Sequence, residues 1–168
     1  MSKTATKSTD RYDELGIDRY ALTDCGTAPW DAIERPAKGV EAYATGEVER
    51  ECVRLAAVFL SRSGFEDVEA SPVAGADLRA TDTRGERPED VLIAVRAGRD
   101  LEGDGLDMPG LNVTTQQGRD LRWSLSSLAQ WCGCDRGRYR ADVMAVAIVG
   151  QRVAKLRHLT GAAWLDLA

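Results

Sequence analysis

The chain has 168 residues, a formal net charge of −5 and a pI near 5.0, which suits one domain with a modest tail. Its 43% hydrophobic and 29% charged residues are typical of a globular protein. No apolar run approaches the roughly 18 residues of a membrane span, and Met1–Asp10 lacks the apolar core of a secretory signal. We therefore expect a cytoplasmic protein with no membrane partner, and the acidic charge argues against coating nucleic acid through bulk charge.

The residues before the first strong pattern predict an N-terminal extension over 1–44, followed by a domain over 45–168. Residues 1–11 are polar and without periodicity, which is typical of disorder. The stretch from Tyr12 to Ala44 is mixed and contains Pro29 and Pro36. It predicts an irregular extension, partly disordered, with short helical turns.

The domain opens with a helix predicted over 45–63, because Val48, Cys52, Leu55 and Phe59 recur on one face before Gly64. Strand patterns follow over 65–70, 77–81 and 91–97, and the apolar run at 91–95 predicts a central strand. Residues 97–112 predict a long loop, 114–131 a second helix, and 139–149 and 153–159 two further strands. The tail over 160–168 is expected to form a helical turn. The predicted order αβββαββ indicates an α/β fold with a mixed central sheet flanked by helices.

Several segments resemble the YraN-like family of PD-(D/E)xK nuclease-fold proteins, over about residues 47–164. The family pattern has a Glu-bearing helix, G-E-I-D and V-F-V-E-V-K strands, a Lys-bearing second helix, R-F-D-V-V-A-V, and H-I-x-x-A-F. The corresponding segments here are Gly75–Leu78 (GADL), Val91–Arg96 (VLIAVR), Gln117, Tyr139–Val146 (YRADVMAV) and His158–Trp164 (HLTGAAW). The last two are the most specific matches. The resemblance implies a restriction-endonuclease-like three-layer core.

The resemblance also implies a catalytic set, in which a Glu and an Asp on neighbouring strands share Mg²⁺ and a Lys helps to activate water. Here Ala94 stands where the family has that Glu, and Arg96 stands where it has Lys. The candidate catalytic residues are therefore Asp77, Arg96, Glu47 and Glu51, with Asp77 as the candidate Mg²⁺ ligand. Each helix Glu is an open candidate for a replacement ligand. By itself, an Asp at a strand start is more often a cap.

The basic residues are concentrated in one part of the chain. The window from Thr115 to Thr160 holds eight basic and three acidic residues, which gives +5, whereas the remainder holds 14 basic and 24 acidic residues, which gives −10. A solvated basic face is the ordinary interpretation, and a surface for phosphates is the functional one. The candidate nucleic-acid-binding residues are Arg119, Arg122, Arg138 and Arg140.

Other side chains have ordinary structural interpretations. Asp142, inside an apolar strand, predicts a buried pair with Arg140 or another arginine, and His158 is expected to be structural. Trp123 and Trp131 are expected to be core or interface anchors rather than base-stacking platforms. The remaining chemistry-bearing group, Cys132-Gly-Cys134, suggests half a metal site or a redox couple, but reduced structural thiols are the favoured interpretation for the cysteines.

Three functions remain open from the sequence. The first is a nuclease-fold protein that is impaired in cleavage and binds nucleic acid. A second is an active Mg²⁺-dependent endonuclease with a rearranged site that uses Asp77 and a helix Glu. The third is a protein-interaction module. Metal binding separates the second from the others, and salt-dependent nucleic-acid binding separates the first from the third.

Overall fold

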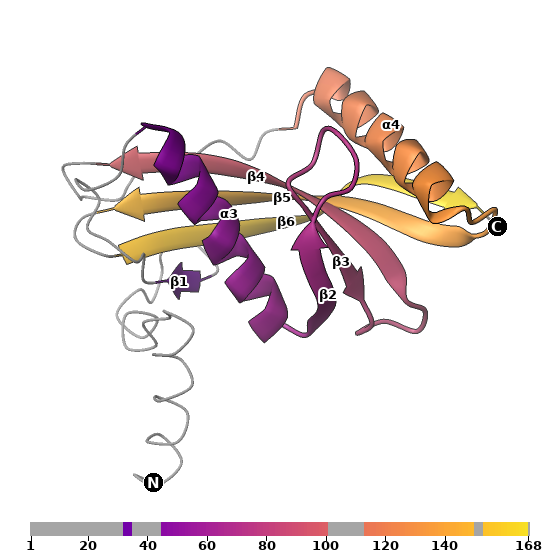
Figure 1. Ribbon diagram of the computed structural model, residues 1–168, viewed down its shortest axis with the longest axis horizontal. Helices are drawn as coiled ribbons and strands as arrows, with labels where there is room; N and C mark the ends of the chain where they lie inside the picture. Colours follow the sequence, from indigo (N-terminus) through magenta and orange to yellow (C-terminus); the bar gives the residue numbers. More distant parts are fainter. Residues whose placement is uncertain (1–31, 35–44, 101–112, 150–152, 168) are drawn as a thin grey trace, which may run out of the picture.

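The computed structural model describes residues 32–34, 45–100, 113–149 and 153–167, which form a mixed sheet between two helices (Figure 1). In chain order the elements are β1 (Ala32–Glu34), α3 (Thr45–Arg62), β2 (Phe65–Ala70), β3 (Leu78–Asp82), β4 (Glu89–Asp100), α4 (Thr115–Cys132), β5 (Gly137–Val149) and β6 (Val153–Leu167). The predicted order αβββαββ and the mixed α/β class are confirmed from residue 45 onward.

The strands lie in the order β1-β6-β5-β4-β3-β2, so β4 is an interior strand, as predicted. Strands β2, β3 and β4 are antiparallel neighbours, and β5 pairs antiparallel with β6. Strand β4 pairs in parallel with β5, from Asp90 opposite Tyr139 to Asp100 opposite Val149. A parallel pair cannot be joined by a tight turn, and α4 lies in the crossover between these two strands.

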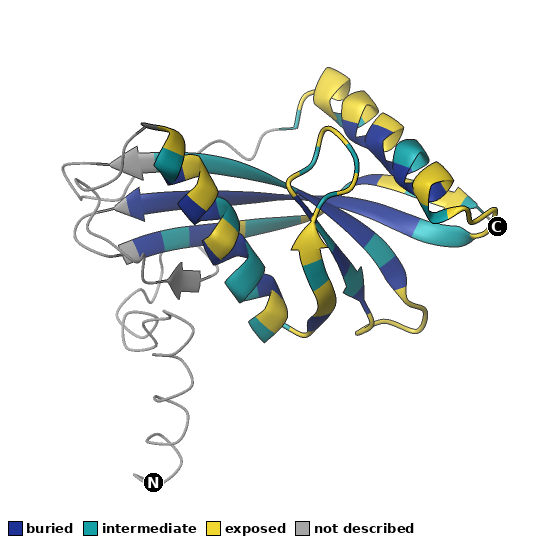
Figure 2. Cartoon of the chain, in the orientation of Figure 1, coloured by how far each residue is buried: buried dark blue, intermediate teal, exposed yellow. Residues whose placement is uncertain are grey.

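Each helix covers its own face of the sheet, which makes three layers. Alternate residues of a strand point to opposite faces. On β4, Val91 and Ile93 pack in the cluster that contains α3, whereas Leu92 packs in the cluster that contains α4. The buried residues accordingly follow the strands and the inner stripes of both helices, while the outer stripes are exposed (Figure 2).

The helix ends are defined by local chemistry. The α4 N-terminus has a reciprocal capping box, in which Thr114 Oγ1 accepts from the Gln117 amide and the Gln117 side chain accepts from the Thr114 amide. At its C-terminus, Gly133 adopts a left-handed φ of 66° and donates to carbonyls of the last turn. Gln117, which the resemblance aligns with a helix lysine, therefore serves as a capping residue.

The connection between β2 and β3 contacts α4 through a glycine. Gly75 has a φ of +91°, and a Cβ built there would lie 2.4 Å from Ser124 Oγ. Ser124 is buried, and its hydroxyl donates to the Asp120 carbonyl. Backbone conformation and packing therefore both require glycine at the start of the Gly75–Leu78 segment.

Three sequence expectations need correction. The tail forms no helical turn, because β6 continues to Leu167 and pairs with the start of β5. Alternation of buried Ala163 and exposed Trp164 is a period-two signal that the prediction missed. Strand β4 extends through Gly98 to Asp100, so the predicted loop starts too early. Within the predicted irregular extension, Ala32–Glu34 forms strand β1 on β6.

The other predictions for residues 1–31, 35–44, 101–112 and 150–152 lie outside the described residues. These include the disorder of residues 1–11. Across the described ranges, the helices include none long and apolar enough to cross a membrane.

We predict that Gly75→Ala lowers the free energy of unfolding by about 2 kcal/mol, because the alanine must adopt a positive φ against Ser124 Oγ. Urea unfolding followed by circular dichroism measures it. Gly46→Ala is the matched control, because Gly46 lies in the first turn of α3 with nothing within 4 Å of a built Cβ. That variant should be unchanged or slightly more stable. Equal effects at both positions would contradict this account of Gly75.

Candidate functional site

Asp77 lies beside the β4 residue that the resemblance places in the metal site. Its backbone N–H donates to the Ile93 carbonyl at 2.9 Å, and its Oδ2 accepts from the Val95 N–H at 2.7 Å. These two contacts lie on either side of Ala94, so Asp77 is next to Ala94 on the neighbouring strand. The Asp77 carboxylate itself acts as a cap on the β4 backbone.

Where the resemblance expects the second carboxylate, Ala94 has a methyl group. Ala94 is half-buried against the cluster beneath α4. A methyl group offers no lone pair to a cation, whereas Mg²⁺ sites in proteins use carboxylates together with substrate oxygens and waters. Arg96 follows two residues later on β4 and is also half-buried. A guanidinium group suits an anion, but arginine keeps its proton at neutral pH and therefore does not serve as a base.

The two helix glutamates lie on α3, which packs on the face of the sheet opposite the Ala94 methyl. Glu51 is buried and accepts a bidentate pair of hydrogen bonds from Arg54, with Nε–Oε2 at 3.0 Å. Glu47 is half-buried in the first turn of α3. Within the part of the chain that the structure describes, no group of three or more His, Cys, Asp or Glu side chains converges as a metal site would require.

The most polar buried feature surrounds Asp142 on β5, which is fully buried. Its carboxylate accepts four hydrogen bonds: two from Arg140, at 2.8 and 3.1 Å, one from His158 Nε2 at 2.8 Å, and one from the Gly161 N–H at 2.9 Å. A carboxylate only accepts, so Nε2 carries the proton of the His158 contact. The predicted pair with Arg140 is confirmed.

Arg140 connects this carboxylate to two others. Its Nη1 donates to Glu89 Oε2 at 2.8 Å and its Nη2 donates to Asp82 Oδ2 at 3.0 Å. Asp82 is also bound by Arg84, and Glu89 by Arg138 at 3.3 Å. Three carboxylates and three guanidinium groups therefore form one network with no net charge. We name these six residues, Asp82, Arg84, Glu89, Arg138, Arg140 and Asp142, the β5 ion network.

The network lowers the pKa values of the Asp82 and Asp142 carboxyl groups. The hydrogen bond from Arg84, with smaller help from Arg140, holds the pKa of Asp82 well below its usual range. Burial alone would raise the pKa of Asp142, but hydrogen bonds from His158, Arg140 and the Gly161 amide outweigh burial and lower it. Both carboxyl groups therefore remain ionised at neutral pH.

A bulge in β6 makes room for the Asp142 carboxylate. Ala141 pairs with Ala163 and Val143 with Leu159, so β6 has extra residues opposite Asp142. Gly161 lies in this bulge with a φ of +76° and directs its N–H at the carboxylate.

Aromatic rings cover the network. The Trp164 indole lies against Gly161, where a built Cβ would be 3.0 Å from its Nε1. It also lies 5.8 Å from the Arg140 guanidinium. His158 packs against the rings of Phe59 and Phe65. These contacts agree with the structural interpretation of His158.

The four candidate nucleic-acid-binding arginines are not on one surface. Arg140 is only 4% exposed and is held by three carboxylates, so it does not belong to a surface patch. Arg138 is partly exposed and pairs with Glu89 and Asp166. Arg119 and Arg122 are exposed on α4. The +5 window therefore overstates the positive charge available at the surface.

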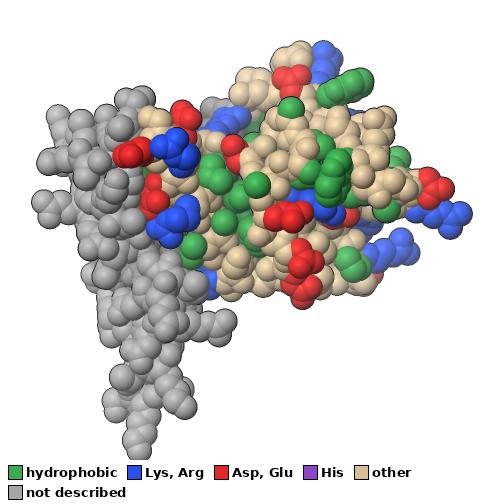
Figure 3. Space-filling model, in the orientation of Figure 1, with side chains coloured by type: hydrophobic (Ala, Val, Ile, Leu, Met, Phe, Trp, Pro, Cys, Tyr) green, Lys and Arg blue, Asp and Glu red, His purple; other side chains and the backbone are tan. Residues whose placement is uncertain are grey.

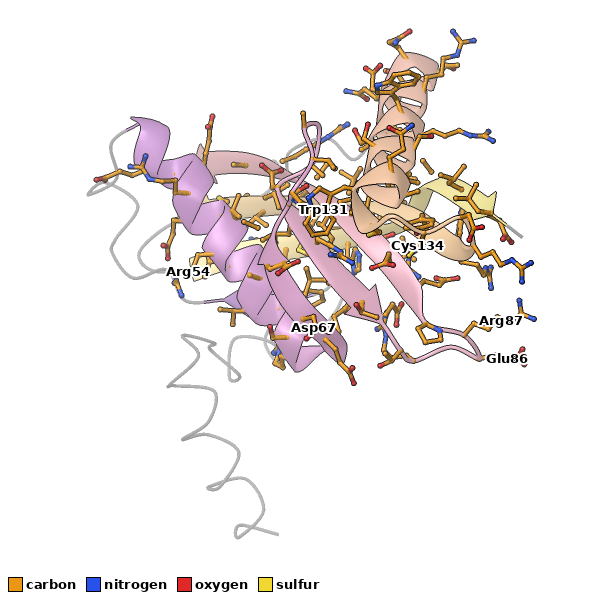
Figure 4. The ribbon with its side chains drawn as sticks, turned by 45° about the vertical axis from the view of Figure 1, so that its right-hand side comes forward. Arg54, Asp67, Glu86, Arg87, Trp131 and Cys134 are labelled. Carbon is orange, nitrogen blue, oxygen red and sulfur yellow. The ribbon has the colours of Figure 1, made fainter. Side chains whose placement is uncertain are left out.

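Hydrophobic and basic side chains both reach the surface in the region of α4 (Figure 3), and the exposed large hydrophobic residues of this helix are two tryptophans. Trp123 is 77% exposed and Trp131 is 57% exposed, which excludes the core alternative predicted for them. Trp131 lies at the C-terminal end of α4 (Figure 4). The Arg79 guanidinium of β3 lies 5.2 Å from the centre of its ring. Arg79 Nη2 also donates to Asp90 at 2.8 Å, which holds the guanidinium beneath the ring.

The cysteines within the described residues are free thiols. Burial raises the pKa of Cys52 to about 12, so this thiol is neutral, and it contacts the Val146 carbonyl at 3.5 Å. Burial likewise raises the pKa of Cys132. Both observations fit the reduced structural role expected of these residues.

Sequence reasoning missed Asp82 and Glu89, because they border a polar hairpin tip and meet Arg140 only through pairing of distant segments. An arginine within an apolar strand was the available signal, since a buried guanidinium needs carboxylate partners. The exposure of Trp123 did have a signal, because this residue lies on the side of the helix opposite the apolar stripe of Leu121, Leu125 and Leu128.

Comparison with known proteins identified no relative: no family model, curated protein or solved structure matches this chain.

We predict that Asp142→Asn lowers the free energy of unfolding by about 3 kcal/mol at pH 7, because it leaves buried Arg140 without its bidentate partner. Guanidinium unfolding measures the change. Asp120→Asn, an exposed carboxylate bonded to Gln116, is the matched control and should change stability by less than about 0.5 kcal/mol.

The pH dependence gives a second readout of the same variant. The folded-state pKa of Asp142 is lowered, so its ionisation stabilises the fold above the unfolded pKa of about 3.9. That stabilisation is lost as the pH falls toward the folded pKa. The stability difference between the parent and Asp142→Asn should therefore narrow below about pH 4. A difference that widened in acid would contradict the assignment.

Proposed function

We propose that this chain has a restriction-endonuclease-like fold that is impaired in cleavage and binds nucleic acid. The observation that carries the proposal is the placement of Asp77 against the residues on either side of Ala94. The chain retains the strand geometry of a metal-dependent nuclease but has a methyl group in place of the second carboxylate.

The three-layer arrangement supports the fold part of the proposal. An αβββαββ order, a mixed sheet and one helix on each face agree with what the resemblance implies. Its two most specific segments, Tyr139–Val146 and His158–Trp164, meet at the β5 ion network. The residues of these two segments that match the family pattern therefore stabilise the fold, and they take no part in the proposed hydrolytic site.

The chemistry of the remaining groups supports impaired cleavage. The Asp77 carboxylate binds a backbone amide, and Arg96 has the charge but not the acid–base range of the lysine it replaces. Glu51, one candidate for a replacement ligand, is bound by Arg54. A rearranged Mg²⁺ site that uses Asp77 and a helix glutamate would need these contacts to be broken.

The surface of α4 supports binding. Arg119 and Arg122 are one turn apart and exposed, and arginine binds phosphate through a planar pair of donors. Asp120, the acidic residue between them, accepts a hydrogen bond from Gln116 at 2.9 Å. Phosphate contacts of this kind give affinity without base recognition.

We predict that the protein binds labelled DNA oligonucleotides with an affinity that falls as salt rises, measured by fluorescence anisotropy. Replacing both arginines, in Arg119→Ala/Arg122→Ala, should reduce the slope of log affinity against log salt by about 1.4 to 1.8, because two phosphate contacts are lost.

Arg50→Ala is the matched control for this measurement, because it removes one exposed arginine from α3, on the opposite face of the sheet. Its salt slope should equal that of the parent. An affinity independent of salt, or an unchanged slope in the double variant, would refute nucleic-acid binding through α4.

A further inference from the structure

We propose that single-stranded nucleic acid lies along the exposed side of α4, with bases stacked on Trp123 and Trp131 and phosphates bound by Arg119 and Arg122. This inference rests on the proposed function and names its substrate class. It departs from the expectation that the two tryptophans are core or interface anchors.

The exposure of the two indoles is the first observation. A tryptophan side chain is the largest apolar surface available to a protein, and leaving it in water is unfavourable. On α4 two of them are 77% and 57% exposed. They are eight residues apart on one helix, which separates them by about 12 Å along its axis. That spacing gives each indole room for its own base.

The contacts of Trp131 restrain its indole ring in a position where a base could stack on it. Arg79 lies 5.2 Å from its ring, and Asp90 holds that arginine through a 2.8 Å ion pair. The guanidinium group beside the ring restrains the Trp131 indole and leaves more than half of the side chain accessible. The Trp131 side chain therefore loses less conformational entropy when a base stacks on its ring.

The charges around the tryptophans favour a nucleic acid over a protein as the occupant. Arg119 is one turn before Trp123 on the same side of α4, and Arg122 is one turn after Arg119. The other side chains that α4 exposes are hydrogen-bonding and, apart from Asp120, uncharged: Thr115, Gln116, Gln117 and Gln130. Arginines that reach phosphates beside aromatic rings that stack bases form the usual single-strand binding surface.

A single strand fits better than a duplex. Base faces inside a duplex are already stacked on their neighbours, so an indole on a helix surface reaches them only where the strand is unpaired. Stacking is tolerant of sequence because every base has a π face. We therefore expect a preference for single strands with little dependence on sequence.

The experiment compares oligothymidylate with a duplex of equal length by anisotropy and by quenching of tryptophan fluorescence. We expect the single strand to bind more tightly and to quench the emission. Trp123→Ala should weaken single-strand binding about tenfold, while Trp123→Phe, which retains an aromatic face, should stay within about threefold of the parent. Because Trp123 is mostly exposed, both variants should fold, which circular dichroism checks.

The outcomes separate this inference from the proposed function. If duplex and single strand bind equally through Arg119 and Arg122 and Trp123→Ala has no effect, the proposed function stands and base stacking is refuted. If neither form of DNA nor an oligouridylate RNA binds, both are refuted, and the α4 surface becomes a candidate interface for a protein.

Discussion

The burial of the Asp142 carboxylate is the constraint on which the arrangement of β5 and β6 depends. An ionised carboxylate away from water is costly unless each oxygen has donors. Here those donors come from the same strand, from His158 and from the backbone at Gly161. The bulge in β6, the positive φ of Gly161 and the indole over it follow from this requirement. Arg140 then links the β5–β6 hairpin to the ends of β3 and β4.

The same constraint explains which parts of the resemblance are specific. The segments whose residue order agrees best with the YraN-like pattern are those that build the β5 ion network. The segments that would perform hydrolysis contain Ala94, Arg96 and Gln117, and the structure gives Gln117 a capping role. The hydrogen bonds around Asp142 are thus complete, whereas Ala94, beside Asp77, has a methyl group where the resemblance expects a carboxylate.

Local sequence patterns were sufficient for most of the fold. The helical spacing of apolar residues in α3 and the apolar run in β4 are patterns within a single segment. Each element could therefore be predicted from its own sequence. The second half of β6 could not be predicted as easily, because its partner is the start of β5 and its alternation is interrupted at Gly161. For the candidate site, the resemblance singled out Asp77 and the β4 positions, and the pairing of these segments agrees with the expected neighbouring strands. The partners of Arg140 could not be predicted, since Asp82 and Glu89 reach it only after three strands have paired.

Titration of Mg²⁺ and Mn²⁺ into the parent protein and into Ala94→Glu, with and without single-stranded DNA, tests the central claim most directly. The account predicts no saturable metal binding and no cleavage for the parent. It predicts saturable binding for Ala94→Glu, which is lost when Asp77→Ala is added, because the new carboxylate would lie beside Asp77 on the neighbouring strand. Saturable metal binding and DNA cleavage by the parent, both abolished by Asp77→Ala, would contradict it and identify an active nuclease with a rearranged site.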